Sequence, residues 1–105
     1  MLQLSQEMRS GWCVVSASGR ADAETADELE KALRAAADSH PRVAADFAAL
    51  DYISSAGLRA VIQAARAAQE AKVEFVVCSL TLPVRKVFDM SGLNQILRIE
   101  GELPC

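Results

Sequence analysis

Two adjacent serines, Ser54 and Ser55, stand where the apolar pattern of the chain changes from that of a strand to that of a helix. A serine at a helix start commonly caps it, because its oxygen accepts a hydrogen bond from a backbone N–H that has no helical partner. The same position suits phosphorylation, because those N–H groups and the positive end of the helix dipole favour an added anion. Both roles are open to either serine.

The residues on either side predict the elements that position these serines. Val43, Ala45 and Phe47 recur with the period of two that is typical of a short buried strand, which we expect to reach a turn at residues 50–52. After the serines, apolar residues recur at helical spacing and predict a helix. Its inner face is predicted to carry Leu58, Val61, Ile62, Ala65 and Gln69. Its solvent face is predicted to carry Arg59, Gln63, Arg66 and Glu70.

The N-terminal part of the chain predicts a hairpin and a helix. Residues 1–8 alternate between apolar and polar like a strand, and after a turn residues 12–18 predict a second strand, which is apolar on both faces near residues 13–15. Asp22 is expected to cap the following helix, with Glu24 in its first turn. The helix is expected to end before Pro41, because proline disfavours helix in the residue that precedes it. Its inner face is predicted to carry Ala26, Leu29, Leu33 and Ala36.

The C-terminal part predicts a strand at residues 73–78, a helix capped by Thr81 and stopped near Gly92, and a last strand at residues 94–100. The inner face of this third helix is predicted to carry Val84, Val87 and Phe88. The predicted fold is therefore α/β, a single domain of residues 1–105 in the order β-β-α-β-α-β-α-β. A mixed, mostly parallel sheet of about five strands would be covered by three main helices.

Composition excludes several classes of protein. The 105 residues, of which 51% are hydrophobic, suffice for one small core, and the net charge of −3 argues against a nucleic-acid partner. No apolar run approaches the roughly 20 residues of a membrane span, and the basic-then-apolar order of a signal peptide is missing, so we expect a soluble, cytoplasmic protein that contacts no membrane. Cys13 and Cys78 are predicted to be buried, whereas Cys105 ends the chain as an exposed thiol.

The sequence does not fit the templates for catalysis. It contains neither Gly-x-Ser-x-Gly nor a glycine-rich phosphate loop, and the only histidine, His40, falls in a predicted connection. Asp22, Asp46 and Asp51 fall near predicted strand ends and could share one rim, but acidic loop residues are more often solvated or capping than metal ligands. We expect no enzyme activity, no cofactor and no metal.

Three segments resemble a known family. Residues 46–58, DFAALDYISSAGL, resemble the signature of the bacterial anti-sigma factor antagonists, the STAS domain family. Residues 19–22 resemble the family's Gly-x-Leu-Asp, with Ala21 in place of leucine, and residues 84–93, VRKVFDMSGL, are similar to its third-helix segment. The matches occur in the family's order and span essentially the whole chain.

This resemblance implies a partner-switching protein. Unmodified members of the family bind an anti-sigma factor that is also a serine kinase of the histidine-kinase-like ATPase fold, and the factor held by that kinase is released. Phosphorylation breaks the complex, and a PP2C-type phosphatase restores it. Carried over, the phosphoacceptor is Ser55, two residues before Gly57. Ser54, where many members have aspartate, is the minor alternative, and Ala56 replaces a second serine.

The resemblance and the expected helix face together predict a partner-binding surface. Its predicted residues are Asp22, Asp46, Ser54, Ser55, Ala56, Gly57, Arg59, Gln63 and Arg66. The protein is expected to act as a monomer. The alternative is a STAS scaffold or sensor subunit within a larger signalling assembly.

Overall fold

The chain begins with an antiparallel hairpin. In the computed structural model, which describes residues 1–95 and 97–103, strand β1 (Leu2–Arg9) pairs with β2 (Trp12–Ala21). Ser10 and Gly11 alone connect them, with φ angles of 52° and 83°. Two consecutive positive φ values give such a turn the same twist as the strands that it joins. The predicted hairpin is confirmed.

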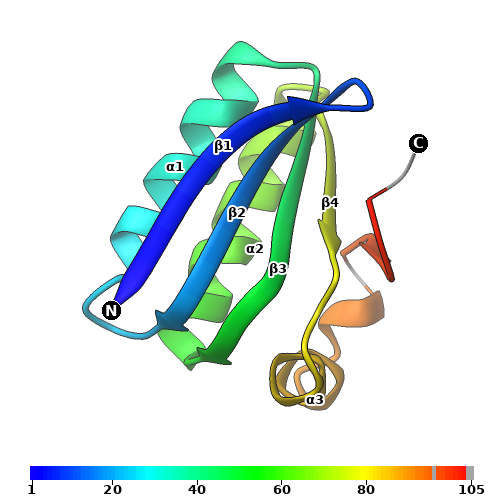
Figure 1. Ribbon diagram of the computed structural model, residues 1–105. Coiled ribbons are helices and arrows are strands. Elements are labelled where there is room, and N and C mark those ends of the chain that lie inside the picture. The colour runs from blue at the N-terminus through cyan, green and yellow to red at the C-terminus, as the bar shows by residue number, and fades with distance from the viewer. Residues whose placement is uncertain (96, 104–105) are drawn as a thin grey trace.

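A single five-stranded sheet follows from this hairpin (Figure 1). Strands β3 (Arg42–Ile53), β4 (Glu74–Cys78) and β5 (Ile99–Glu100) add to it in chain order, each parallel to its neighbour. Among the strand pairings of the described residues, only that of β1 with β2 is antiparallel. The predicted mixed and mostly parallel sheet is therefore confirmed, as is the order of the elements along the chain.

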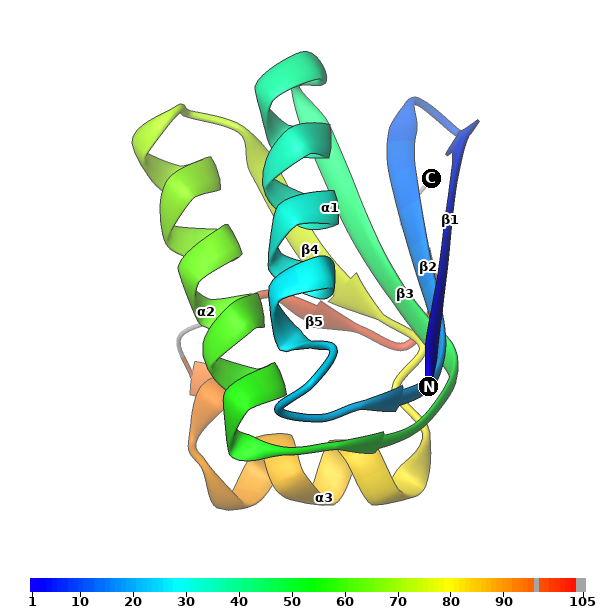
Figure 2. The ribbon, with the colours of Figure 1, turned by 90° about the vertical axis from the view of Figure 1, so that its left-hand side faces the viewer.

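Two helices cover one face of the sheet and a third lies across its end (Figure 2). The covering helices are α1 (Ala26–Ser39) and α2 (Ser55–Glu70), which pack side by side. Ala60 and Ala64 of α2 are buried, and their small side chains allow close packing. Helix α3 (Leu82–Met90) lies at the end of the sheet where α2 begins.

Helix α3 is held on β3 by an aromatic pair and a hydrogen bond. Phe88 and Phe47 are fully buried, with ring centroids 6.5 Å apart and an edge-on angle of 68°. Thr81 precedes α3 as predicted, but its side chain makes no capping bond. Its hydroxyl instead donates to the carbonyl of Leu50 at 2.8 Å, which ties the helix start to β3.

The opposite face of the sheet carries a smaller apolar cluster around Trp12, which is 2% exposed. The guanidinium groups of Arg42 and Arg98 lie 5.6 and 5.7 Å from the centre of its ring. Cys78 belongs to this cluster and Cys13 to the main core, so both are buried as predicted. Burial raises the pKa of both thiols. The predicted exposed thiol at position 105 lies outside the described residues.

Both central strands run further than the sequence predicts. β2 continues to Ala21 and β3 continues to Ile53, and these two residues pair with each other in the ladder. The turn predicted at residues 50–52 is therefore wrong, because these residues belong to β3. Gly19 permits this, because its φ is 94° and a Cβ there would collide with the carbonyl oxygen of Met1. This glycine produces an irregularity within the strand and does not end it.

The predicted last strand at residues 94–100 is wrong over most of its length. Leu93–Gln95 is a short 3-10 helix, residue 96 lies outside the described residues, and only β5 pairs with β4. Gly92, with a φ of 71°, turns the chain directly after α3. Leu93 is then buried against the core as part of the 3-10 helix. An apolar residue can be buried from a helical turn as well as from a strand, so the apolar pattern alone does not separate the two.

Candidate functional site

Ser54 caps helix α2. It is extended, with φ −89° and ψ 174°, and its Oγ accepts a hydrogen bond from the N–H of Gly57 at 3.2 Å. Its own N–H donates to the carbonyl of Ala21 at 2.8 Å, which joins the start of α2 to the end of β2. The capping role that the sequence left open between two serines therefore belongs to Ser54.

Ser55 is the first residue of α2, and its side chain is exposed. Within residues 1–95 and 97–103, no side-chain hydrogen bond involves its hydroxyl. It borders a hollow of about 390 Å³ between α2 and the segment that follows α3. The α2 wall of this hollow carries Arg59, Gln63 and Arg66, and Ser91 and Leu93 stand opposite. The structure thus brings Ser55 together with three of the predicted partner-binding residues.

The inner and outer faces of α2 match the prediction in part. Arg59, Arg66 and Glu70 are exposed, Gln63 and Ala56 are half-buried, and Leu58, Val61 and Gly57 are buried. Gln69 is exposed, although the pattern places it inside, and Ala65 and Ile62 are only partly covered. The buried stripe is rotated toward Ala60, Ala64 and Ala68, because α2 packs against α1 as well as against the sheet.

Asp22 lies beside this site but does not cap α1. Thr25 precedes the helix, and Asp22 Oδ1 accepts hydrogen bonds from the N–H groups of Glu24 and Thr25 at 3.1 and 3.2 Å. The expected first-turn residue Glu24 therefore precedes the helix, in a turn organised by Asp22. Partial desolvation raises the pKa of this carboxyl, but bonds from Thr25 and Glu24 and the nearby N-terminal ammonium lower it more, so the net pKa is below its ordinary value.

Asp46 does not belong to the site. It pairs with Ser16 in the middle of the β2–β3 ladder, forms an ion pair with Arg9 at 3.5 Å and accepts a hydrogen bond from the N–H of Ala48 at 3.0 Å. It lies seven positions before Ile53 in β3, about 23 Å along the strand. The expected rim of three aspartates is therefore wrong, since the longer β3 carries Asp46 away from the sheet end.

The helix start and the hollow lie within a segment that identifies the family. Residues 4–99 match the family model described as Mlab, STAS domain. The chain belongs to the STAS domain family. Its sheet and three helices, with Ser55 at the start of α2, are thus those of a STAS domain.

Several relatives of this STAS domain are anti-sigma factor antagonists by name. BtrV of Bordetella bronchiseptica is 35% identical over 99 residues, covering 93% of this chain and 85% of BtrV. The crystal structure of an anti-sigma factor antagonist from Mycobacterium paratuberculosis has a TM-score of 0.83 and 28% identity, covering 98% of this chain and 88% of that one. The structure of unphosphorylated SpoIIAA shares the fold with a TM-score of 0.72 and 16% identity, covering 97% of this chain and 90% of that one. The structure of phosphorylated SpoIIAA has a TM-score of 0.70 and 19% identity, covering 92% of this chain and 90% of that one.

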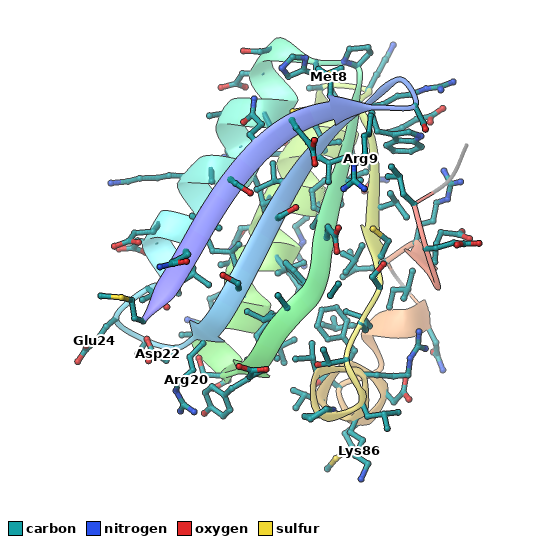
Figure 3. All side chains as sticks on the ribbon, in the orientation of Figure 1. Met8, Arg9, Arg20, Asp22, Glu24 and Lys86 are labelled. Carbon is teal, nitrogen blue, oxygen red and sulfur yellow. The ribbon has the colours of Figure 1, made fainter. Side chains whose placement is uncertain are left out.

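The STAS domain carries a cationic feature at the same end that sequence reasoning missed. Figure 3 shows Arg20 beside Asp22, and the Arg20 guanidinium lies 4.1 Å from the centre of the Tyr52 ring. Tyr52 is 39% exposed, so the pair is open to solvent at the end of β3, two residues before Ser54. The only sequence signal would have been the pairing of these residues across β2 and β3, which depends on the extended register.

The helices of this STAS domain are short. α2, at 16 residues, is the longest helix in the described part of the chain. No helix there combines the length and the apolar character needed to cross a membrane.

Replacing the capping serine is expected to destabilise the STAS domain modestly. Ser54→Ala removes the bond to the N–H of Gly57 and should lower the free energy of unfolding by about 1 kcal/mol, measured by urea denaturation. Ser54→Asp is the matched control, because a carboxylate also caps and favours the helix dipole. Equal losses in both variants would contradict the capping role.

Gly57 is required by a close approach of α2 to the sheet. A Cβ at this position would lie 2.8 Å from both the Ala21 carbonyl oxygen and Ile53 Cγ1. We expect Gly57→Ala to lower the free energy of unfolding by about 1–3 kcal/mol, despite the better helix propensity of alanine. Gly101→Ala, where a Cβ meets nothing within 4 Å, is the control and should change stability by less than about 0.5 kcal/mol. A stabilised Gly57→Ala protein would contradict the packing described.

Proposed function

We propose that this STAS domain is an anti-sigma factor antagonist that is switched by phosphorylation of Ser55. The observation that carries the proposal is that the two serines have different environments. Ser54 is committed to the cap, whereas the Ser55 hydroxyl is exposed and borders a hollow. A kinase can therefore reach Ser55 without unfolding α2. The names of BtrV and of the Mycobacterium paratuberculosis protein support the antagonist role.

The proposed partner is an anti-sigma factor that is also a serine kinase of the histidine-kinase-like ATPase fold. The kinase transfers the terminal phosphoryl group of ATP to Ser55 Oγ, so that an Oγ–P bond forms, the bond to the ADP oxygen breaks and the hydroxyl proton passes to a base of the kinase. A PP2C-type phosphatase hydrolyses the Oγ–P bond, which returns the serine and releases inorganic phosphate. Unmodified protein binds the partner, and the phosphorylated form does not.

The fold is suited to accept this modification without rearrangement. The phosphate would stand at the N-terminus of α2, where unpaired N–H groups and the helix dipole favour an anion. The first turn of α2 contains no acidic residue that would repel it. A phosphorylated form of SpoIIAA, which has the same fold, supports the same conclusion. Phosphorylation is therefore proposed to change the surface and to leave the core intact.

The proposed binding surface surrounds Ser55 at one end of the sheet. The turn of Asp22 adjoins it through the bond between Ala21 and Ser54, and Arg20 with Tyr52 extends it on the same side. The arginines of α2 extend it along the hollow. Asp46 is left out of this surface because it lies in the middle of β3.

Phosphorylation with ATP and candidate kinases of this fold, followed by mass spectrometry, tests the proposal. We expect one added phosphate on Ser55 with the wild-type protein and with Ser54→Asp, and none with Ser55→Ala. Because Ser54→Asp keeps the cap, it separates loss of an acceptor from loss of the helix start. Phosphate found only at other residues would contradict the proposed switch.

A further inference from the structure

The hollow beside Ser55 brings a cationic side chain to the proposed phosphorylation site. Arg59 follows Ser55 by four residues on α2, which places both on one face of the helix a turn apart. Both residues line the hollow of about 390 Å³. Arg59 is exposed, and none of the ion pairs among residues 1–95 and 97–103 includes it. Its guanidinium is therefore available to an anion at Ser55.

The other side chains of the hollow leave Arg59 as the cation within reach. Ser91 and Leu93, on the wall opposite α2, carry no charge. Arg66 lines the same hollow but follows Ser55 by eleven residues, about 16 Å along the helix axis. That separation exceeds what a phosphoserine and an arginine on one helix can span, so of the two arginines that line the hollow only Arg59 is placed to contact a phosphate on Ser55.

We propose that Arg59 binds the phosphate of phosphorylated Ser55 within this hollow. The proposal rests on the proposed function, because the contact exists only when Ser55 carries a phosphate. A guanidinium can donate two parallel hydrogen bonds to phosphate oxygens, an arrangement stronger than bonds between neutral groups. An acidic group four residues N-terminal to a basic one is also the favoured order on a helix.

This contact makes phosphorylation change two features of the surface at once. The neutral hydroxyl of Ser55 becomes a group with nearly two negative charges. The guanidinium of Arg59, free in the unmodified protein, turns to the phosphate and is no longer offered to a partner. A partner that contacts this hollow therefore meets a surface with one cation fewer and a new anion, which deepens the difference between the two states.

A phosphorus NMR titration tests the contact directly. Phosphoserine is installed at position 55 during translation, and its second pKa, ordinarily about 6, is measured in the wild type, Arg59→Gln and Arg66→Gln. Arg59 favours the dianion, so we expect the wild-type pKa to be lower than that of Arg59→Gln by roughly 0.2–0.4 unit. Arg66→Gln makes the same change in net charge and should titrate like the wild type. Arg20 and Asp22, the charged groups on the other side of the helix start, are the same in all three.

Two outcomes would overturn the proposal. One is an equal phosphate pKa in the wild type and Arg59→Gln, and the other is an equal rise in both arginine variants, which would show an effect of net charge alone. Glutamine is a good helix former and Arg59 is exposed, so both variants should fold. Because translation supplies the phosphate, the titration needs no kinase. Failure of a kinase to modify Ser55 would contradict the proposed function, but would not change the titration.

Discussion

Phosphorylation of Ser55 is expected to weaken binding of the anti-sigma partner roughly a thousandfold, about 4 kcal/mol. The unmodified hydroxyl is small and neutral, whereas the phosphate adds nearly two negative charges within the proposed binding surface. Asp22 already puts a carboxylate beside the start of α2, and the hydrogen bonds that lower its pKa keep it ionised. A partner surface matched to the unmodified form therefore meets both a steric and an electrostatic conflict.

Isothermal titration calorimetry with the purified partner measures this effect across a series of variants. Ser55→Ala should bind like the unmodified protein, and Ser55→Asp, with one charge, should fall between Ser55→Ala and the phosphorylated form. Ser10→Asp is the control, because it adds the same charge in the hairpin turn, where its φ of 52° is one that aspartate tolerates. That turn lies at the end of the sheet opposite Asp22, next to the labelled Arg9 in Figure 3. Equal affinities of Ser55→Ala and Ser55→Asp would refute the charge mechanism.

Phe88→Ala is expected to lower the free energy of unfolding by about 3–5 kcal/mol. The Phe88 side chain is fully buried, and its ring meets Phe47 of β3 edge-on at 6.5 Å. Truncation removes this contact and leaves a cavity between α3 and the sheet. The total free energy of unfolding of a small domain is about 5–15 kcal/mol, so this single change removes a large part of the stability.

Urea denaturation of two further variants sharpens this test. Leu82→Ala, in the same helix but 75% exposed, should change the free energy of unfolding by less than about 0.5 kcal/mol. Phe88→Leu keeps most of the volume and should lose clearly less than Phe88→Ala, so it stays measurable if the alanine variant does not fold. A loss of under about 1 kcal/mol in Phe88→Ala would show that α3 is not docked on β3 as described.

The local features of the site were predictable because they are set by neighbours in the chain. A change of period from two to 3.6 at Ser54 and Ser55 predicts a helix start there, and the structure has α2 beginning at Ser55. The sequence could not choose the capping serine. That choice depends on the backbone direction at Ser54, which its bond to the Ala21 carbonyl on another strand secures.

Features that depend on strand pairing were not predictable. Asp46 is near the site in sequence but far from it in space, because β3 is longer than its alternating pattern indicates. Arg20 and Tyr52, far apart in sequence, meet because the extended ladder pairs them directly. The distance of Asp46 from the site and the contact of Arg20 with Tyr52 both depend on how far the β2–β3 ladder extends. That length is set by backbone pairing between two distant segments of the chain.

The sequence by itself therefore determined the order of the elements, the family resemblance and the position of two serines at a helix start, since each depends on patterns within a few neighbouring residues. The tertiary structure alone decided which serine stays free, which charges of other segments surround it and that Ser91 and Leu93 complete the hollow beside it. Those properties depend on register and on packing between α2, α3 and the sheet, and contacts between distant segments carry no local signal in a single sequence.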